Sequence, residues 1–189
     1  MAEPATRKMT VDEFFAWQAE QEYNYELVDG VPVMTVKAMT GASDTHDRVT
    51  VNAIGTLFAQ LRGKPCRLKT ASVRTFRGTR RPDITIECGK PRPQDMAADQ
   101  PRVVIEVLSP STMRYDRFQK LLEYQQHPSI QVIMLVDTES PLVTVLRRQE
   151  ALWNSFEHQG LEAVIDLPEV EADLPLAELY LGVEFGSGA

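Results

Sequence analysis

Two acidic residues stand at positions where carboxylates can do chemistry. Asp83 opens a short apolar segment after Pro82, and Glu106 interrupts the nearly continuous apolar run Val103–Leu108. A carboxylate buried in such a run must be protonated, ion-paired or bound to a cation, because an unpaired buried charge is costly. If the two segments are neighbouring strands, both carboxylates can face one hard cation such as Mg²⁺, which prefers oxygen ligands. The alternatives are a Pro-Asp turn opening for Asp83 and a core salt bridge for Glu106.

Further groups lie close to Glu106 along the chain. The main-chain carbonyl of Val107 can add a third ligand at the strand edge. The helical segment that follows carries Asp116, Lys120 and Tyr124 at spacings of four residues, which places them on one face of the helix. We expect the Lys120 ammonium to hold a phosphate oxygen and to steady a water activated by the metal. The alternative interpretation is an exposed Asp116–Lys120 pair, which contributes little.

Several elements must position these groups. Thr10 and Glu13 form a capping-box pattern that predicts a first helix of about 11 residues. Asp29-Gly30 predicts a tight hairpin turn, with Glu26 on the first strand of the hairpin. Apolar residues at helical spacing predict a second helix that starts near Ser43 or Asp44 and ends at Leu61, with His46 in its first turn.

Short segments rich in β-branched residues alternate with the helical ones. They are Cys66–Phe76, Asp83–Cys88, Val103–Leu108, Gln131–Val136 and Leu142–Arg147. After the Ser109–Thr112 turn a helix is expected from about Met113 to His127, with Pro128 closing it. An edge strand and a short helix near Leu176–Leu179 complete the chain. This alternation predicts an α/β fold with one mixed sheet flanked by helices, in a single domain over residues 1–189.

Composition limits the classes of protein. The chain has 189 residues, of which 43% are hydrophobic and 25% charged, which is typical of a packed globular domain. No apolar run reaches the length of a membrane span, and the N-terminus lacks the apolar stretch of a signal peptide, so the sequence predicts a cytoplasmic protein without membrane association. Cys66 and Cys88 form no CxxC motif. We therefore expect two small buried thiols, and neither a disulfide framework nor a zinc site.

The net charge of −7 argues against a protein that coats nucleic acid by bulk positive charge. A local basic strip is the exception. Arg74, Arg77, Arg80 and Arg81 lie within eight residues, directly before Pro82-Asp83. We predict that Arg80 and Arg81 contact the substrate, whereas the alternative is a set of arginines on a solvated hairpin.

The order of these residues carries a family resemblance. The matching positions are Glu26, His46, Pro82-Asp83, the segment 106–112 (Glu-Val-Leu-Ser-Pro-Ser-Thr), Asp116, Lys120 and Tyr124. Over roughly Met9 to Leu146 the chain resembles the Uma2 family of the PD-(D/E)XK nuclease superfamily. The resemblance implies a restriction-endonuclease-like fold, a homodimer, and an endonuclease in which Asp83 and Glu106 bind Mg²⁺ or Mn²⁺ during DNA cleavage. It also implies that Glu26 is the upstream acidic residue of the site, and that His46, Ser109, Asp116 and Tyr124 contact the substrate.

One position departs from the superfamily pattern. The lysine of Glu-x-Lys would fall at position 108, where this chain has Leu108. A leucine cannot polarise a water, and Lys120 on the following helix is the natural substitute. The departure, together with the acidic net charge, keeps a second hypothesis open, in which the chain is a non-catalytic interaction or regulatory module with a nuclease fold, also as a homodimer.

Overall fold

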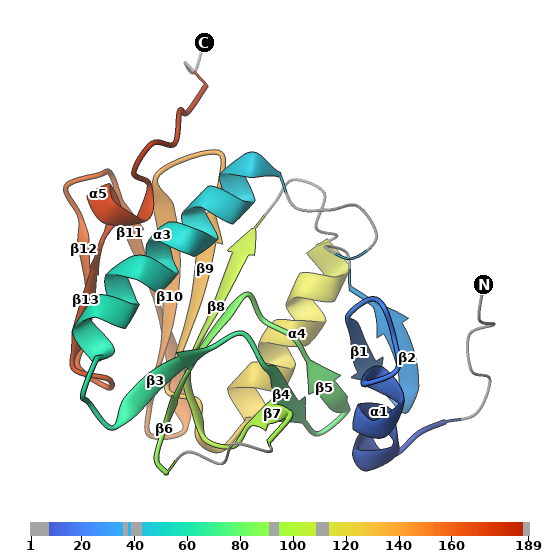
Figure 1. The fold of residues 1–189 in the computed structure, drawn as a ribbon. Coiled ribbons are helices and arrows are strands. Elements are labelled where there is room, and N and C mark those ends of the chain that lie inside the picture. The colour runs from blue at the N-terminus through green and yellow to red at the C-terminus, as the bar shows by residue number, and fades with distance from the viewer. Residues whose placement is uncertain (1–7, 36–37, 39–42, 91–94, 109–113, 187–189) are drawn as a thin grey trace.

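The computed structural model describes residues 8–35, 38, 43–90, 95–108 and 114–186. The predicted α/β class is confirmed, since mixed sheets are flanked by helices (Figure 1). The main sheet has the strand order β11-β10-β9-β8-β6-β3. Its strands are β3 (Cys66–Lys69), β6 (Ile84–Cys88), β8 (Pro101–Leu108), β9 (Val132–Asp137), β10 (Leu142–Gln149) and β11 (Leu152–Gln159). All neighbours are antiparallel except β8 and β9, which are parallel.

A second sheet has the order β2-β1-β5-β4-β7. Its strands are β1 (Tyr25–Val28), β2 (Val31–Met34), β4 (Ser72–Thr75), β5 (Gly78–Arg80) and β7 (Ala97–Ala98). A two-stranded sheet consists of β12 (Val164–Leu167) and β13 (Ala172–Pro175). The prediction of one sheet was therefore wrong. The predicted strand Cys66–Phe76 is in fact β3 and β4, which pair in different sheets, and β-propensity cannot show a change of partner.

Helices cover both faces of the six-stranded sheet. On one face lie α3 (Asp44–Leu61), with Ser43 as its N-cap, and the short α5 (Leu176–Leu179), both close to their predicted bounds. Residues of α3 such as Leu57 share a core with Ile84 and Ile105. On the other face α4 (Arg114–Gln126) packs, and it also borders the five-stranded sheet (Figure 1). There Tyr124 joins a core with Val104. The alternation along β8 thus directs even-numbered residues toward α4.

The N-terminal elements pack beside the β1–β2 hairpin. Helix α1 (Val11–Gln18) has the predicted capping box, but it contains 8 residues and so is shorter than expected. The hairpin turns at Asp29-Gly30 as predicted, with φ values of 51° and 84°. Glycine accepts this left-handed conformation without the steric cost that other residues meet. The hairpin carries Glu26 on β1 toward α4.

The expectation of two free thiols was wrong, because Cys66 and Cys88 form a disulfide. The two residues are direct partners in the antiparallel register of β3 and β6. They are 22 residues apart in sequence and belong to no recognisable motif, so only the strand register brings them together. No helix within the described ranges has the length and apolar character to span a membrane.

Candidate metal centre

Asp83 and Glu106 come from neighbouring antiparallel strands. The register pairs Ile84 with Ile105 and Thr85 with Val104, and one further step places Asp83 opposite Glu106. Opposite residues of an antiparallel pair project from the same face of the sheet. The Val107 N–H also donates to Asp83 Oδ2 at 2.9 Å, which holds the aspartate against the end of β8. The two carboxylates that the sequence singled out therefore lie side by side.

Glu106 lies in an environment that disfavours its negative charge. Burial raises the pKa of Glu106 from its ordinary value of 4.5 to about 7, and the charge of Asp83 adds to the rise. The Lys120 ammonium and a hydrogen bond from Tyr124 oppose it, and the Tyr124 hydroxyl donates to Glu106 Oε1 at 2.7 Å. These partners leave the carboxyl short of positive charge. A bound cation would supply the missing charge.

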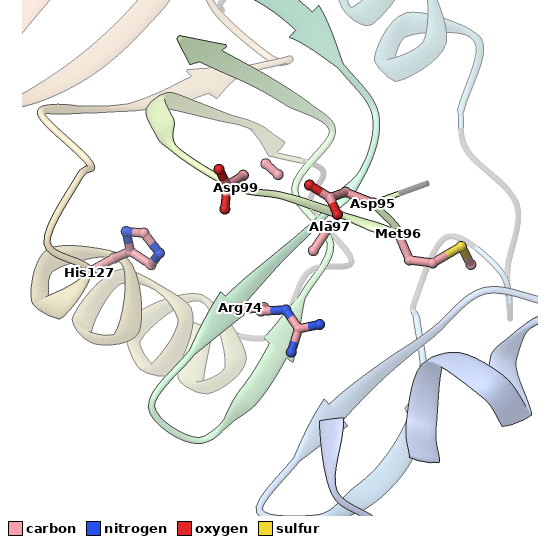
Figure 2. Close-up of a pocket in the computed structure, with 7 residues that line it drawn as sticks. Arg74, Asp95, Met96, Ala97, Asp99 and His127 are labelled. Atoms are coloured by element: carbon pink, nitrogen blue, oxygen red, sulfur yellow. The ribbon is translucent and has the colours of Figure 1, made fainter. Parts of the chain in front are cut away.

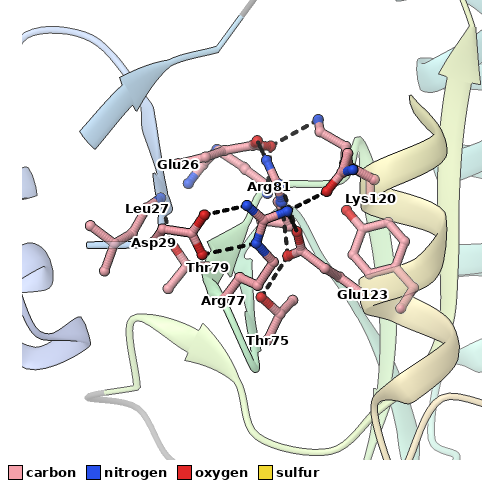
Figure 3. A network of polar contacts seen from close by, with 12 residues as sticks. Glu26, Leu27, Asp29, Thr75, Arg77, Thr79, Arg81, Lys120 and Glu123 are labelled. Carbon is pink, nitrogen blue, oxygen red and sulfur yellow. Dashed lines mark hydrogen bonds and ion pairs between the residues drawn. The ribbon is translucent and has the colours of Figure 1, made fainter. Parts of the chain in front are cut away.

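Lys120 points into this site. Its Nζ lies 2.9 Å from Glu26 Oε1, and its side chain is 16% exposed. Its charge is also the largest influence that lowers the pKa of Glu106, so the ammonium is close to both glutamates. The ammonium is therefore largely buried rather than fully exposed. The side chain of Asp116, its partner in the alternative interpretation, lies outside the described residues. Figure 3 shows Lys120 on α4 reaching toward Glu26 on β1.

Glu26 is buried and receives several donors. Arg80 NH1 contacts Glu26 Oε2 at 3.1 Å, and the Arg81 main-chain N–H donates to Oε1 at 2.9 Å. Together with Lys120, these donors satisfy both carboxylate oxygens. Glu26 is thus held beside the candidate metal centre by residues of β5 and α4.

The sequence did not point to Glu123, which is 1% exposed and grips Arg80 with both oxygens. Arg80 Nε contacts Oε2 at 3.0 Å and Arg80 NH2 contacts Oε1 at 2.6 Å, while the Thr75 hydroxyl donates to Oε2 at 2.7 Å. One signal was available in the sequence. Glu123 follows Lys120 by three residues and therefore lies on the same face of α4.

The predicted basic strip is largely neutralised, because three of its four arginines pair with acidic residues. Arg80 is 2% exposed and is occupied by Glu26 and Glu123, so the predicted substrate contact does not fit its position. Arg77 pairs with Asp29, which raises the pKa of Arg77 and lowers that of Asp29. Arg74 pairs with an acidic residue of α1. Arg81 remains beside the site, where burial lowers the pKa of its guanidinium. Acidic residues from other parts of the sequence pair with these arginines, which accounts for the difference.

The other predicted substrate contacts have different surroundings. His46 is buried, with Nε2 3.3 Å from Asp83 Oδ1, so it lies directly against the candidate metal centre. Tyr124 is also buried in the core and donates to Glu106, so the predicted contact with the substrate does not fit its position. Burial and the Glu106 charge raise the pKa of Tyr124 further above its ordinary value, so it remains a donor. Ser109 and the side chain of Asp116 lie outside the described residues.

The donor set suits a hard divalent cation. Val107 directs its N–H toward Asp83, and the N–H and C=O of one strand residue point to the same side, so the Val107 carbonyl faces that side too. The site then offers two carboxylates and a carbonyl, all oxygen donors. In the described parts of the chain no group of three or more His, Cys, Asp or Glu side chains is placed to hold a metal ion. Mg²⁺ accepts such a sparse set because it retains several waters.

A polar cavity of about 250 Å³ lies elsewhere, beside β7 and the end of α4 (Figure 2). Its lining includes Arg74, Asp95, Asp99 and His127, and burial lowers the pKa of His127. None of the predicted site residues lines it. The candidate metal centre is therefore defined by converging side chains rather than by this cavity.

Comparison with known proteins gives concordant findings. The model of the Uma2 family, described as "Putative restriction endonuclease", matches residues 11–177. The uncharacterized protein slr1290 of Synechocystis sp. is 29% identical over 189 residues, with 94% of each chain covered. A second uncharacterized Synechocystis protein, sll1609, is 24% identical over 144 residues and covers 72% of this chain and 79% of its own.

One solved structure is similar in fold. The crystal structure of "a putative nuclease belonging to DUF820" from Anabaena variabilis superposes with a TM-score of 0.72 at 18% identity. The similarity covers 91% of this chain and 97% of the other. At this level of identity it bears on the fold alone.

Proposed function

Because the chain belongs to the Uma2 family, described as "Putative restriction endonuclease", we propose that it is a Mg²⁺- or Mn²⁺-dependent endonuclease that hydrolyses DNA phosphodiester bonds. The observation that carries the proposal is the convergence of Asp83, Glu106 and the Lys120 ammonium at the end of β8. This is the arrangement expected of a PD-(D/E)XK site in which the lysine comes from the next helix.

Each group has a role in the proposed reaction. Asp83, Glu106 and the Val107 carbonyl would hold the cation, which when bound lowers the pKa of a water and offsets the charge of the phosphate. Lys120 would hold a phosphate oxygen or the attacking water, as an ammonium does in a preorganised site. Glu26 directs this lysine inward. His46 would fix the second oxygen of Asp83.

The test is a cleavage assay on supercoiled plasmid and on single-stranded DNA, with Mn²⁺, with Mg²⁺ and with EDTA. We expect metal-dependent cleavage by the wild-type chain and none by Asp83→Ala. Isothermal titration with Mn²⁺ on the same two proteins separates a loss of metal binding from a loss of chemistry. Wild-type protein that binds Mn²⁺ but leaves every substrate intact would contradict the proposed activity.

One observation favours a second candidate, a nuclease-fold interaction module without catalysis. Arg74, Arg77 and Arg80 pair with acidic residues, which offsets three of the four positive charges of the predicted basic strip and so reduces its attraction for nucleic acid. In that case DNA binding should be absent at low salt as well. A fluorescence anisotropy titration with a labelled duplex at about 20 mM and 200 mM salt distinguishes the two candidates.

We further propose that the chain acts as a single domain, in the cytoplasm, and as a homodimer. The eight-residue strand β11 is an edge of the main sheet, and exposed edges favour association. Light scattering coupled to size-exclusion chromatography measures the mass directly. A monomer at all concentrations would rule out the dimer.

A further inference from the structure

Four charged side chains, of which three are buried and Lys120 is half-buried, connect the five-stranded sheet to α4. Arg80 contacts both carboxylate oxygens of Glu123 at 2.6 and 3.0 Å and Glu26 at 3.1 Å. Glu26 in turn lies 2.9 Å from the Lys120 ammonium, a contact that Figure 3 shows. Two acidic and two basic side chains alternate along this series of contacts, so their charges balance. Each carboxylate is more than nine-tenths buried. We refer to these four residues as the ionic relay.

The ionic relay begins and ends on the same helix. Glu123 and Lys120 are three residues apart on α4, whereas Glu26 and Arg80 belong to β1 and β5 of the five-stranded sheet. Arg80 therefore bridges from the sheet to the helix, and Lys120 returns from the helix to the sheet. Arg80 holds Glu26 in position, and Glu26 also contacts Lys120.

The geometry gives Arg80 a fixed orientation. A guanidinium held by both oxygens of a carboxylate is planar and bidentate, which adds directional control to the charge attraction. The fork toward Glu123 uses Nε and NH2 and leaves NH1 directed at Glu26. A lysine side chain, by contrast, is flexible and relies on its partner for its position. Glu123 therefore fixes the orientation of Arg80, Arg80 fixes Glu26, and Glu26 fixes the position of the Lys120 ammonium.

We propose that Arg80 and Glu123 are positioning residues, which hold Glu26 so that it directs the Lys120 ammonium toward Asp83 and Glu106. The assignment rests on the proposed function for its catalytic consequence. It replaces the substrate contact predicted for Arg80. It also explains why a carboxylate as buried as Glu123 is kept on α4 beside the site.

A second cluster in the same protein provides a matched control. Glu87 on β6 is likewise 1% exposed, and it pairs with Arg67 and with Lys69, whose Nζ lies 2.9 Å from Glu87 Oε1. The Lys69 side chain is 22% exposed, close to the 16% of Lys120. Each lysine thus has a buried glutamate at the same distance. Glu87 belongs to the main sheet, whereas Glu26 and Arg80 of the relay belong to the five-stranded sheet.

The experiment measures acetylation rates of Lys120 and Lys69 by peptide mass spectrometry, in wild type, Arg80→Lys, Glu123→Gln and Glu87→Gln. In the first two variants we expect Lys120 to react about tenfold faster and Lys69 to stay unchanged, because a charge-assisted contact is worth about that factor. In Glu87→Gln we expect the opposite result, in which Lys69 reacts faster and Lys120 stays unchanged. The assay needs no enzymatic activity, so it decides the positioning even if the chain does not cut DNA.

Two outcomes overturn the proposal. Lys120 that stays protected in both relay variants would show that its position does not depend on Arg80 and Glu123. If Lys120 and Lys69 are both acetylated faster in both variants, as in a protein that loosens or unfolds, Arg80 and Glu123 stabilise the fold in general. Circular dichroism melts on the same samples identify the second case.

The activity arm then separates positioning from metal binding. With active wild type, Arg80→Lys and Glu123→Gln should lower kcat about 100-fold, which is the order reported for a displacement of about 1 Å in a catalytic group. The affinity for Mn²⁺ should stay the same, and Glu87→Gln should retain wild-type kcat. Unchanged kcat in variants whose Lys120 has become reactive would refute the catalytic consequence. An inactive wild type would refute only the proposed function.

Discussion

Glu87 and Glu106 lie in the same sheet, yet their surroundings differ in kind. Glu87 on β6 is surrounded by donors, namely Arg67, Lys69 and the Asp99 main-chain N–H. Glu106 on β8 has a tyrosine hydroxyl and a nearby ammonium, and it faces a second carboxylate, so its pKa rises to about 7. A buried acid with matched cations serves structure, whereas a buried acid beside another acid is poised for a cation. The contrast identifies the candidate centre without a bound ligand.

The largest expected effect concerns the second carboxylate of that centre. Asp83→Ala removes one of the two proposed side-chain ligands, and we expect cleavage to fall by more than about 1000-fold and Mn²⁺ binding to be lost. Loss of a metal ligand should weaken metal binding more than loss of a residue that hydrogen-bonds to a ligand, which costs about 10- to 100-fold in affinity. Calorimetric titration and plasmid cleavage provide the measurements. Mn²⁺ binding at wild-type strength in Asp83→Ala would place the metal elsewhere.

Lys120→Ala tests the role of the lysine ammonium rather than that of the proposed metal ligands. Cleavage should fall about 100- to 1000-fold, the range for removal of one preorganised electrostatic group. Mn²⁺ affinity should remain within a few-fold of wild type, in contrast to Asp83→Ala. Lys69→Ala is the control, since that lysine pairs with Glu87. If both lysine variants cut DNA at the wild-type rate, Lys120 has not replaced the side chain missing at Leu108.

Much of this contrast was accessible from the sequence, and part of it was not. Glu106 stood out because it interrupts an apolar strand, and Lys120 because helical spacing directs it back over that strand. Glu87, also between apolar neighbours, drew no attention, and its basic partners could be recognised only from the β3–β6 register. Arg80 was misjudged for the same reason. Local patterns give elements and faces, while the partners of a charged side chain depend on tertiary packing.

The two glutamates should respond with opposite sign when they are neutralised. Glu87→Gln leaves basic groups without their counter-ion, and it should destabilise the fold by about 3 kcal/mol. Glu106→Gln should stabilise the metal-free fold by about 2 kcal/mol at pH 8, because the pKa of Glu106 is raised in the folded state. The stability contributed by Glu106 is fully present below its ordinary pKa of 4.5 and is lost as pH rises through about 7. Urea unfolding at pH 5 and pH 8 in EDTA measures both effects.

The pH dependence decides this prediction. The stability gap between wild type and Glu106→Gln should be small at pH 5 and should open toward pH 8. For Glu87→Gln the destabilisation should persist at both values. A Glu106→Gln protein that is less stable than wild type at pH 8 would mean that the carboxylate is already compensated by protein groups, and that the site has no need of a cation.

The smallest expected effect concerns the hydroxyl that supports Glu106. Tyr124→Phe keeps the buried ring and removes only the hydrogen bond of 2.7 Å to Oε1. Because that bond lowers the pKa of Glu106, its loss should raise the pKa further and weaken Mn²⁺ binding at pH 7 by roughly tenfold, about the worth of one hydrogen bond to a charged group. The deficit should shrink at pH 9, where the carboxyl ionises in either protein. A deficit of equal size at both pH values would show that Tyr124 acts through the packing of α4 rather than through the charge of Glu106.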